Sequence, residues 1–240
     1  MRLIQHKQEA YWFYRFLSIF YDKYVNPFFW NPVMRTKALE LAQLNRRDLK
    51  TLDVGAGTGF TTEGIVEGVQ PRSVTMLDQS PHQLEKAKRK AALSECQKLL
   101  GDAEDLPFPT DHFERYVSAG SIEYWPNPQR AITEAYRVLK PGGMALIIGP
   151  LRRRNSFVRL LSDTWMLFPN EEDYLNWYRQ AGFINIAKSY IAPSWYEDEG
   201  NPYGIVIAGV KPAVGPSPLA IEKEEELKEP MTLGRFLVFS

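Results

Sequence analysis

The stretch Leu52–Gly64, which reads LDVGAGTGFTTEG, decides the fold of this chain. Its three glycines, Gly55, Gly57 and Gly59, follow a short apolar run and precede a helix-like segment. Glycine allows a tight turn, a positive φ angle and close approach of a ligand to the backbone. The first turn of the following helix offers unpaired N–H groups. The stretch therefore predicts a strand, a turn and a helix, with a ligand site at the turn.

Short apolar runs alternate with helix-like stretches after this turn. The predicted strands cover 51–55, 73–78, 97–102, 115–120 and 144–149, and the predicted helices cover 58–69, 81–95 and 127–139, the last ended by KPGG at 140–143. This alternation indicates βαβ units and a parallel sheet with helices on both faces. After a helix at 170–181, strands at 184–191 and 203–211 have no helix between them, so we expect them to pair antiparallel.

These elements predict one α/β domain with a Rossmann-like, seven-stranded, mostly parallel sheet whose last strand is antiparallel. We expect that domain at 49–212, with a lid or insert at 151–182. Aromatic residues crowd 9–29, and a second helix is expected at 32–44, so 1–48 is predicted to form aromatic helices that cover the active site. Residues 213–240 are rich in proline and charge and are predicted to form a flexible tail.

Composition excludes several classes of protein. The 240 residues carry a formal net charge of +0, so nothing global indicates a nucleic-acid partner. The lone cysteine, Cys96, rules out an internal disulfide and multi-cysteine zinc sites, and no metal is expected. No apolar run approaches the ~18 residues that a membrane-spanning helix needs. We expect the chain as printed to be soluble or peripheral to a membrane.

The residues around the glycine turn indicate which kind of ligand it binds. A dinucleotide fingerprint would place its third glycine at position 60, where Phe60 stands, so we expect the helix to keep away from the strand there. The Gly-Lys-Ser/Thr of a phosphate-binding loop is absent as well. From Thr51 to Pro71 there is no Lys or Arg. The turn therefore favours a cationic ligand.

Aspartates at the ends of successive predicted strands agree with this interpretation. Asp78 is placed to accept hydrogen bonds from both hydroxyls of a ribose. Asp102 is placed to accept from the amine of adenine, with the Ala103 N–H meeting a ring nitrogen. Asp53, beneath the turn, favours an ammonium or sulfonium charge. Together they predict S-adenosylmethionine (SAM) as cofactor and S-adenosylhomocysteine (SAH) as its product.

Longer blocks carry a resemblance to a known family. LDVGAGTGF, LDQSPHQLEKAK and GDAEDLPFPTD resemble the class I SAM-dependent methyltransferases. EAYWFYRFLSIFYD, SAGSIEYWPNPQR and DTWMLFP are similar to the 2-methyl-6-phytyl-1,4-hydroquinone / 2-methyl-6-solanesyl-1,4-hydroquinone methyltransferases of plastids and related organisms. The resemblance covers residues 3–218.

This resemblance implies methyl transfer from SAM to a ring carbon of a prenylated hydroquinone, as in tocopherol and plastoquinone biosynthesis. It implies membrane association, at the plastid inner envelope in a plant or alga and otherwise at the cytoplasmic face of a membrane. Two alternatives stay open. One is a related methyltransferase, of the ubiquinone/menaquinone type or acting on another small molecule, and the other is a non-catalytic SAM-binding, membrane-associated protein.

The loop after the fourth strand, 118–128, is predicted to lie beside the cofactor, because ligands bind beyond the carboxyl ends of parallel strands. Glu123 and Tyr124 are the predicted catalytic residues, with Glu123 as the base; Glu123 could instead cap a helix or orient a neighbour. The predicted substrate contacts are Trp125, Tyr14 and Trp165. The predicted cofactor contacts are Asp53, Gly55, Ala56, Gly57, Gly59, Asp78, Gln79, Asp102, Ala103, Ser118 and Tyr21.

Residues 151–168 combine arginines with aromatic and aliphatic residues. Such a composition is typical of a helix that lies in the plane of a membrane surface. A mobile lid with a solvated basic face is the alternative. In either case we expect this insert to border the substrate entrance.

Overall fold

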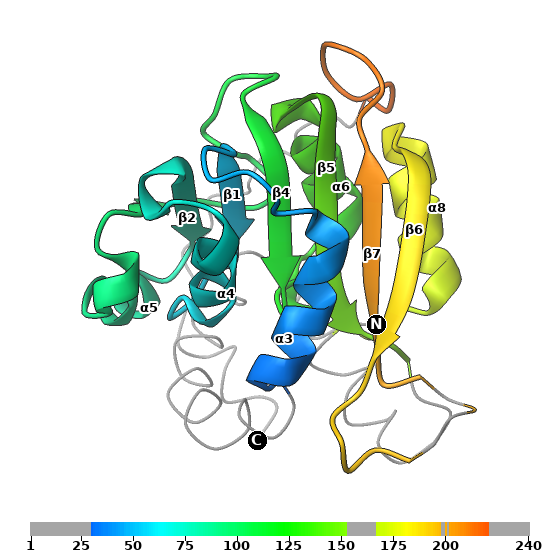
Figure 1. Ribbon diagram of the computed structural model, residues 1–240. Coiled ribbons are helices and arrows are strands. Elements are labelled where there is room, and N and C mark those ends of the chain that lie inside the picture. The colour runs from blue at the N-terminus through cyan, green and yellow to red at the C-terminus, as the bar shows by residue number, and fades with distance from the viewer. Residues whose placement is uncertain (1–29, 153–166, 198–199, 201, 221–240) are drawn as a thin grey trace, which may run out of the picture.

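The computed structural model describes residues 30–152, 167–197, 200 and 202–220 (Figure 1). These residues form one sheet in the order β3-β2-β1-β4-β5-β7-β6. Every neighbouring pair is parallel except the two that involve β7. The predicted fold class, a seven-stranded sheet with one antiparallel strand, is confirmed, and so is the antiparallel pairing of the last two strands.

Most of the strands match the predicted segments. They are β1 (Thr51–Val54), β2 (Val74–Asp78), β3 (Gln97–Leu100), β4 (Phe113–Ala119), β5 (Leu139–Pro150), β6 (Ile184–Ile191) and β7 (Gly204–Val210). The helices are α3 (Pro32–Leu39), η2 (Glu40–Ala42), α4 (Phe60–Gly68), η3 (Pro71–Ser73), α5 (Pro81–Lys88), η4 (Ala91–Leu93), η5 (Ile122–Tyr124), α6 (Pro128–Val138) and α8 (Glu171–Ala181).

Side-chain caps fix where four of these helices begin. The side chains of Asn31, Ser80, Asn127 and Asn170 each accept a hydrogen bond from a backbone N–H in the first turn of α3, α5, α6 and α8. Such caps satisfy N–H groups that have no partner inside the helix. The first three helices also carry proline in the first turn, where its missing N–H does no harm.

Helices cover both faces of the sheet, α3 and α4 on the near face in Figure 1 and α6 and α8 on the far face. Alternate residues of each central strand enter different clusters of buried side chains. In β5, Ala145 and Ile147 pack in the cluster with α6 and α8, whereas Leu146 and Ile148 pack in the cluster with α3 and α4. Strands buried on both faces read as continuous apolar runs, which is why the sequence reveals them.

Two predicted boundaries are wrong. The helix predicted at 81–95 ends at Lys88, and Lys90 is extended before the separate turn η4. The KPGG stretch at 140–143 does not follow the helix as a loop, because β5 already begins at Leu139. Gly142, with φ of +76°, and Lys211 are linked by a backbone hydrogen bond of 2.8 Å.

The segment after β7 stays attached to the domain at least as far as Ser217. The Gly215 N–H donates to Asp111 Oδ2 at 2.9 Å, and the Ser217 hydroxyl donates to the Ala181 carbonyl at 2.8 Å. The flexible tail predicted from residue 213 therefore does not begin there. Residues 221–240 lie outside the described part of the chain.

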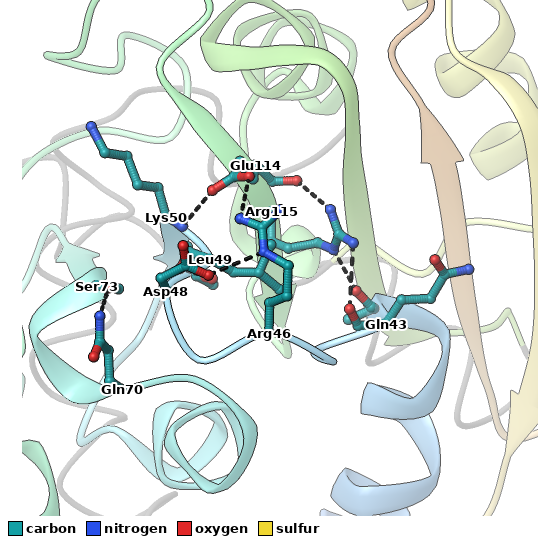
Figure 2. A network of polar contacts seen from close by, with 11 residues as sticks. Gln43, Arg46, Asp48, Leu49, Lys50, Gln70, Ser73, Glu114 and Arg115 are labelled. Atoms are coloured by element: carbon teal, nitrogen blue, oxygen red, sulfur yellow. Dashed lines mark hydrogen bonds and ion pairs between the residues drawn. The ribbon is translucent and has the colours of Figure 1, made fainter.

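The parallel strands β1, β2 and β4 end at the lower edge of the sheet in Figure 1. A polar network closes the opposite edge (Figure 2). There Glu114 accepts hydrogen bonds from Arg46 Nη2 at 2.8 Å and from the Lys50 N–H at 3.0 Å. Arg115 donates to the carbonyl oxygens of Ala42 and Gln43. The network ties the segment before β1 to the start of β4, which leaves the carboxyl edge as the place for a ligand site.

The most buried charge of the described residues stabilises the fold and lies away from that edge. The side chain of Lys211, which is 0% exposed, donates to Asp111 Oδ1 at 2.6 Å and to the Gly215 carbonyl at 2.5 Å. The ammonium group also lies 4.8 Å from the centre of the Tyr136 ring. Together these contacts replace the water that the ammonium group loses on burial, as a buried charge requires.

Replacing Asp111 with alanine should lower the free energy of unfolding by about 3 kcal/mol, because Lys211 then remains buried without its counter-charge. Chemical denaturation at neutral pH measures the change. The control is Glu172→Ala, which removes an ion pair to Arg179 between exposed side chains and should cost less than about 1 kcal/mol. Equal effects of the two substitutions would contradict a stabilising role for the buried pair.

Candidate active site

The glycine turn after β1 is held against β2 by its backbone. The N–H groups of Gly55 and Ala56 both donate to the Leu77 carbonyl, at 2.8 and 3.1 Å. Gly55, Gly57 and Gly59 all have positive φ angles, of 69°, 56° and 85°. Residues with a Cβ rarely adopt this conformation, so the predicted need for glycine at all three positions is confirmed.

Each glycine faces a different neighbour. A Cβ on Gly55 would lie 2.5 Å from the Cβ of Ser121, and one on Gly59 would lie 2.3 Å from Leu93 Cδ1. A Cβ on Gly57 would meet nothing within 4 Å. The close neighbour of Gly59 is the Leu93 side chain of η4, not a residue of β1, so the expectation that Phe60 keeps the helix away from the strand stays a prediction. Gly57 alone faces open space, where a ligand can approach the backbone.

Asp78, at the end of β2, holds the turn in place. Its Oδ2 accepts a hydrogen bond from the Gly57 N–H at 2.8 Å, and its Oδ1 accepts from the Ser80 N–H at 2.8 Å. The carboxylate therefore lies directly beside the open side of the turn. This position agrees with the predicted ribose contact, which stays a prediction. The next residue, Gln79, is exposed at the same edge.

Asp53 lies beneath the turn and is 1% exposed. Its Oδ2 accepts a hydrogen bond from the Thr62 hydroxyl at 2.6 Å, whereas its Oδ1 has no partner. Burial raises the pKa of Asp53 to about 7, the hydrogen bond from Thr62 opposes the rise, and the negative charge of Asp78 adds to it. A positive charge above the turn would favour the ionised form of this carboxyl group.

The loop after β3 is joined to the loop after β4. Asp102 Oδ1 accepts a hydrogen bond from the Glu104 N–H at 2.9 Å, and Ala103 between them is buried. The buried Glu104 carboxylate in turn accepts from the Asn127 N–H at 2.7 Å. Asp102 and Ala103, the predicted adenine contacts, thus stand on a loop that is braced against residues 118–128.

Glu123, the predicted base, follows β4 in the short helix η5 and is 8% exposed. Its Oε2 has no hydrogen-bond partner. Burial raises the pKa of Glu123 to about 7, and a hydrogen bond from its own N–H opposes the rise. Among the described residues, that bond is the one contact of the Glu123 side chain that agrees with the capping alternative. A buried carboxyl group with an unused oxygen and a pKa near neutrality has the properties of a general acid or base.

The buried Tyr174 of α8 is a neighbour of Glu123 that the sequence did not reveal. Burial, with the negative charge of Glu123 next in order, raises the pKa of Tyr174 well above its usual value. Its hydroxyl donates to the Pro150 carbonyl at 3.0 Å. Gly149 makes room for this hydroxyl, because a Cβ there would lie 2.2 Å from it. Tyr174 is therefore a fixed phenol, on a helix at the far side of the sheet, whose ionisation the negative charge of Glu123 disfavours.

The remaining predicted site residues differ in where they lie. Ser118 and Ser121 share a hydrogen bond of 2.6 Å directly against Gly55. Tyr124 is half-buried beside Glu123, and the Trp125 ring is buried in the cluster of α6 and α8. Their roles at the substrate stay predictions. Tyr14, Tyr21 and Trp165 lie outside the described residues, as do 1–29 and 153–166.

A cation does approach α4, though not at the glycine turn. Arg35 of α3 donates to the Phe60 carbonyl at 2.9 Å and pairs with Glu67 at 3.0 Å. Gly64 leaves room for it, since a Cβ there would lie 2.7 Å from Arg35 Nε. The guanidinium group occupies the flank of the helix, so the carboxylates of Asp53 and Asp78 still decide the charge around the turn.

Besides Tyr174, sequence reasoning missed three residues that shape the site: Thr62, Ser121 and Glu104. The carboxylate of Glu104 is one of three acidic groups within four residues, and the sequence does not say which one turns inward. A sequence signal for Thr62 does exist. A helix that begins after a turn runs back over the preceding strand, so a polar residue in its first turn lies near the acidic residue of that strand, as Thr62 lies near Asp53. In the described part of the chain no group of three or more His, Cys, Asp or Glu side chains could hold a metal ion.

Comparisons with known proteins agree with this geometry. Residues 52–147 match a family described as a methyltransferase domain. The fold resembles phosphoethanolamine N-methyltransferase 2 of Haemonchus contortus, solved in complex with S-adenosyl-L-methionine, with a TM-score of 0.64 and 20% identity over 88% of this chain and 59% of that one. At this identity the likeness supports the fold alone.

Sequence relatives are much nearer. The chain is 56% identical to the chloroplastic 2-methyl-6-phytyl-1,4-hydroquinone methyltransferase of Arabidopsis thaliana, over 99% of this chain and 73% of the relative. It is 54% identical to the chloroplastic 2-methyl-6-phytyl-1,4-hydroquinone methyltransferase 1 of Oryza sativa subsp. japonica, over 98% of this chain and 73% of the relative. With its domain and its fold, the chain is an enzyme of the SAM-dependent methyltransferase class. It belongs to the family of the 2-methyl-6-phytyl-1,4-hydroquinone methyltransferases.

Proposed function

We propose that this enzyme uses SAM to methylate a ring carbon of a prenylated hydroquinone of the 2-methyl-6-phytyl or 2-methyl-6-solanesyl type. The observation that carries the proposal is the 56% identity, over 99% of the chain, to a relative named for that hydroquinone. The reaction would serve tocopherol or plastoquinone biosynthesis.

The carboxyl edge of the sheet fits the proposed cofactor. Gly57 has open space beside its backbone, and Asp78 lies next to it. Asp53 has an unused oxygen beneath the turn, suited to a neighbouring positive charge. Asp102 and Ala103 stand on the adjoining loop, where hydrogen bonds to adenine are proposed. When bound, SAM supplies a methyl group on a positively charged sulfur.

Glu123 is the proposed base. A hydroquinone ring carbon becomes a better nucleophile as its neighbouring hydroxyl loses a proton, so the enzyme needs a group that accepts this proton. Glu123 Oε2 is buried without a partner, and the pKa of about 7 makes this carboxylate a stronger base than an exposed one. Tyr124 and Trp125, next in the chain, are proposed to shape the pocket for the ring.

We further propose that the enzyme works at a membrane surface, in plastids if it shares the chloroplastic location of its named relatives. A long prenyl chain resides in lipid, so a peripheral enzyme must reach it there. The basic and apolar residues of 151–168 favour such contact. Among the helices of the described residues, none combines the length and hydrophobicity needed to cross a membrane.

Asp78→Ala should weaken SAH binding by about 1.5–3 kcal/mol, because a charged hydrogen-bond acceptor and the anchor of Gly57 are lost together. Isothermal titration calorimetry measures the change. The control is Glu85→Ala, which removes an exposed carboxylate from the same region and should leave the affinity unchanged. If both variants bind like the wild type, the ribose assignment of Asp78 is wrong.

Glu123→Gln should reduce turnover of the hydroquinone by about 100-fold or more while SAH binding stays intact, since a general base contributes ~10²–10⁴-fold. In the wild type, kcat/KM should rise with pH up to about 7, because Glu123 is protonated and inactive below its pKa. The variant should lose this rise. The control is the exposed Glu95→Gln. Wild-type turnover with an unchanged pH profile would remove Glu123 from the mechanism.

Replacing Arg152, Arg153 and Arg154 together with alanine should weaken flotation with anionic vesicles, since each basic residue near such a surface contributes ~1 kcal/mol. A matched control removes the same charge elsewhere, by alanine at the exposed Lys37, Lys88 and Arg89. Equal vesicle binding by the two triple variants would exclude a specific role for the insert.

A further inference from the structure

Gln83, in the first turn of α5, has a buried amide oxygen that the fold leaves without a partner. The residue is 7% exposed, and its Oε1 has no hydrogen bond. A buried acceptor that has lost its water and gained no donor destabilises the protein around it. Leucine or methionine would fill the same space without this penalty. A ligand that supplies the missing donor would explain why glutamine is used.

The helix start places Gln83 beside the predicted cofactor contacts. Its N–H donates to the hydroxyl of Ser80, the cap of α5, at 3.4 Å. The N–H of Ser80 donates to the carboxylate of Asp78, which also holds Gly57. Gln83 therefore belongs to the same short chain of hydrogen bonds that fixes the open side of the glycine turn.

The direction of the side chain follows from its helix. Gln83 and Ala87 lie one turn apart on the buried face of α5. Ala87 faces the glycine turn, because a Cβ on Gly59 would lie 3.7 Å from its Cβ. Side chains of a helix lean toward its N-terminus, which here is the carboxyl edge of the sheet. Ala87 lies beside Gly59, and Gln83, one turn nearer the carboxyl edge, therefore lies toward Gly57. A Cβ on Gly57 would meet nothing within 4 Å.

We propose that Gln83 binds the cofactor, with its Oε1 accepting a hydrogen bond from a ribose hydroxyl beside Asp78. This inference rests on the proposed function, since it assumes that the turn holds SAM or SAH. A ribose offers two neighbouring hydroxyl donors, and a neutral amide accepts one of them without adding negative charge next to Asp53 and Asp78. The ribose of the proposed cofactor by itself supplies the donor that Gln83 Oε1 lacks.

A ligand contact and a structural contact predict opposite changes in Gln83→Leu. The ligand-free protein should unfold at the same temperature as the wild type or at a higher one, because the unpaired oxygen is gone. SAH should bind about tenfold more weakly, as expected for one lost hydrogen bond. A residue that only supported the helix would lower the unfolding temperature.

The deciding experiment is calorimetric titration of wild type and Gln83→Leu with SAH and with its 2′-deoxy and 3′-deoxy analogues. For one of the two analogues, the leucine substitution should cost no further affinity. That analogue lacks the hydroxyl that donates a hydrogen bond to Gln83 in the wild type. Gln83→Met serves the same purpose if the leucine variant does not fold. The control is Gln129→Leu in α6, another glutamine whose Oε1 is buried and unpaired, and it should bind all three ligands like the wild type.

The possible failures are distinguishable. If the wild type does not bind SAH at all, the proposed function fails and this inference fails with it. If the wild type binds SAH but Gln83→Leu weakens all three ligands by the same factor, or none of them, only the ribose contact of Gln83 is overturned. A lower unfolding temperature of the ligand-free variant, with unchanged affinities, would assign Gln83 to the fold.

Discussion

The turn after β1 depends on side chains of other segments that approach its glycine backbone more closely than a Cβ there would allow. Ser121 lies against Gly55 and Leu93 lies against Gly59, so the segments after β4 and α5 close on the same five residues. The Leu77 carbonyl and the Asp78 carboxylate then hold the turn from β2. A Cβ at either end of the turn would push these segments apart. The arrangement of the whole carboxyl edge follows from that contact.

Acidic groups collect at this edge, and the fold does little to neutralise them. Asp53 and Glu123 are buried, each has an oxygen without a partner, and both have pKa values raised by burial to about 7. Lys211 shows that the same fold fully satisfies a buried charge where it serves stability. Among the described residues, both buried carboxylate groups that keep an oxygen without a partner therefore lie where a ligand is proposed to bind, a common property of functional sites.

The sequence was sufficient for the order of elements, because strands buried on both faces are continuous apolar runs and the glycine turn marks the first crossover. It placed Asp53, Asp78, Asp102 and Glu123 at one edge for the same reason. The sequence could not show that the predicted helix 81–95 is interrupted at Lys90, because the interruption depends on how η4 packs. Nor could it show which polar side chains are buried without partners: Gln83 resembles an ordinary surface glutamine until its surroundings are known. Interactions between segments far apart in the chain, such as the effect of the Glu123 charge on the pKa of Tyr174, are absent from local patterns.

The position of β7 also affects how the chain folds as it is made. This strand, the last in sequence among the described residues, lies between β5 and β6 in the sheet. Until the ribosome has released residues 204–210, β6 has no neighbour with which to pair, and one side of β5 is an open edge. An unpaired edge rich in isoleucine and leucine invites pairing with other chains. The nascent chain therefore exposes an edge that is prone to pair with other chains until residues 204–210 emerge.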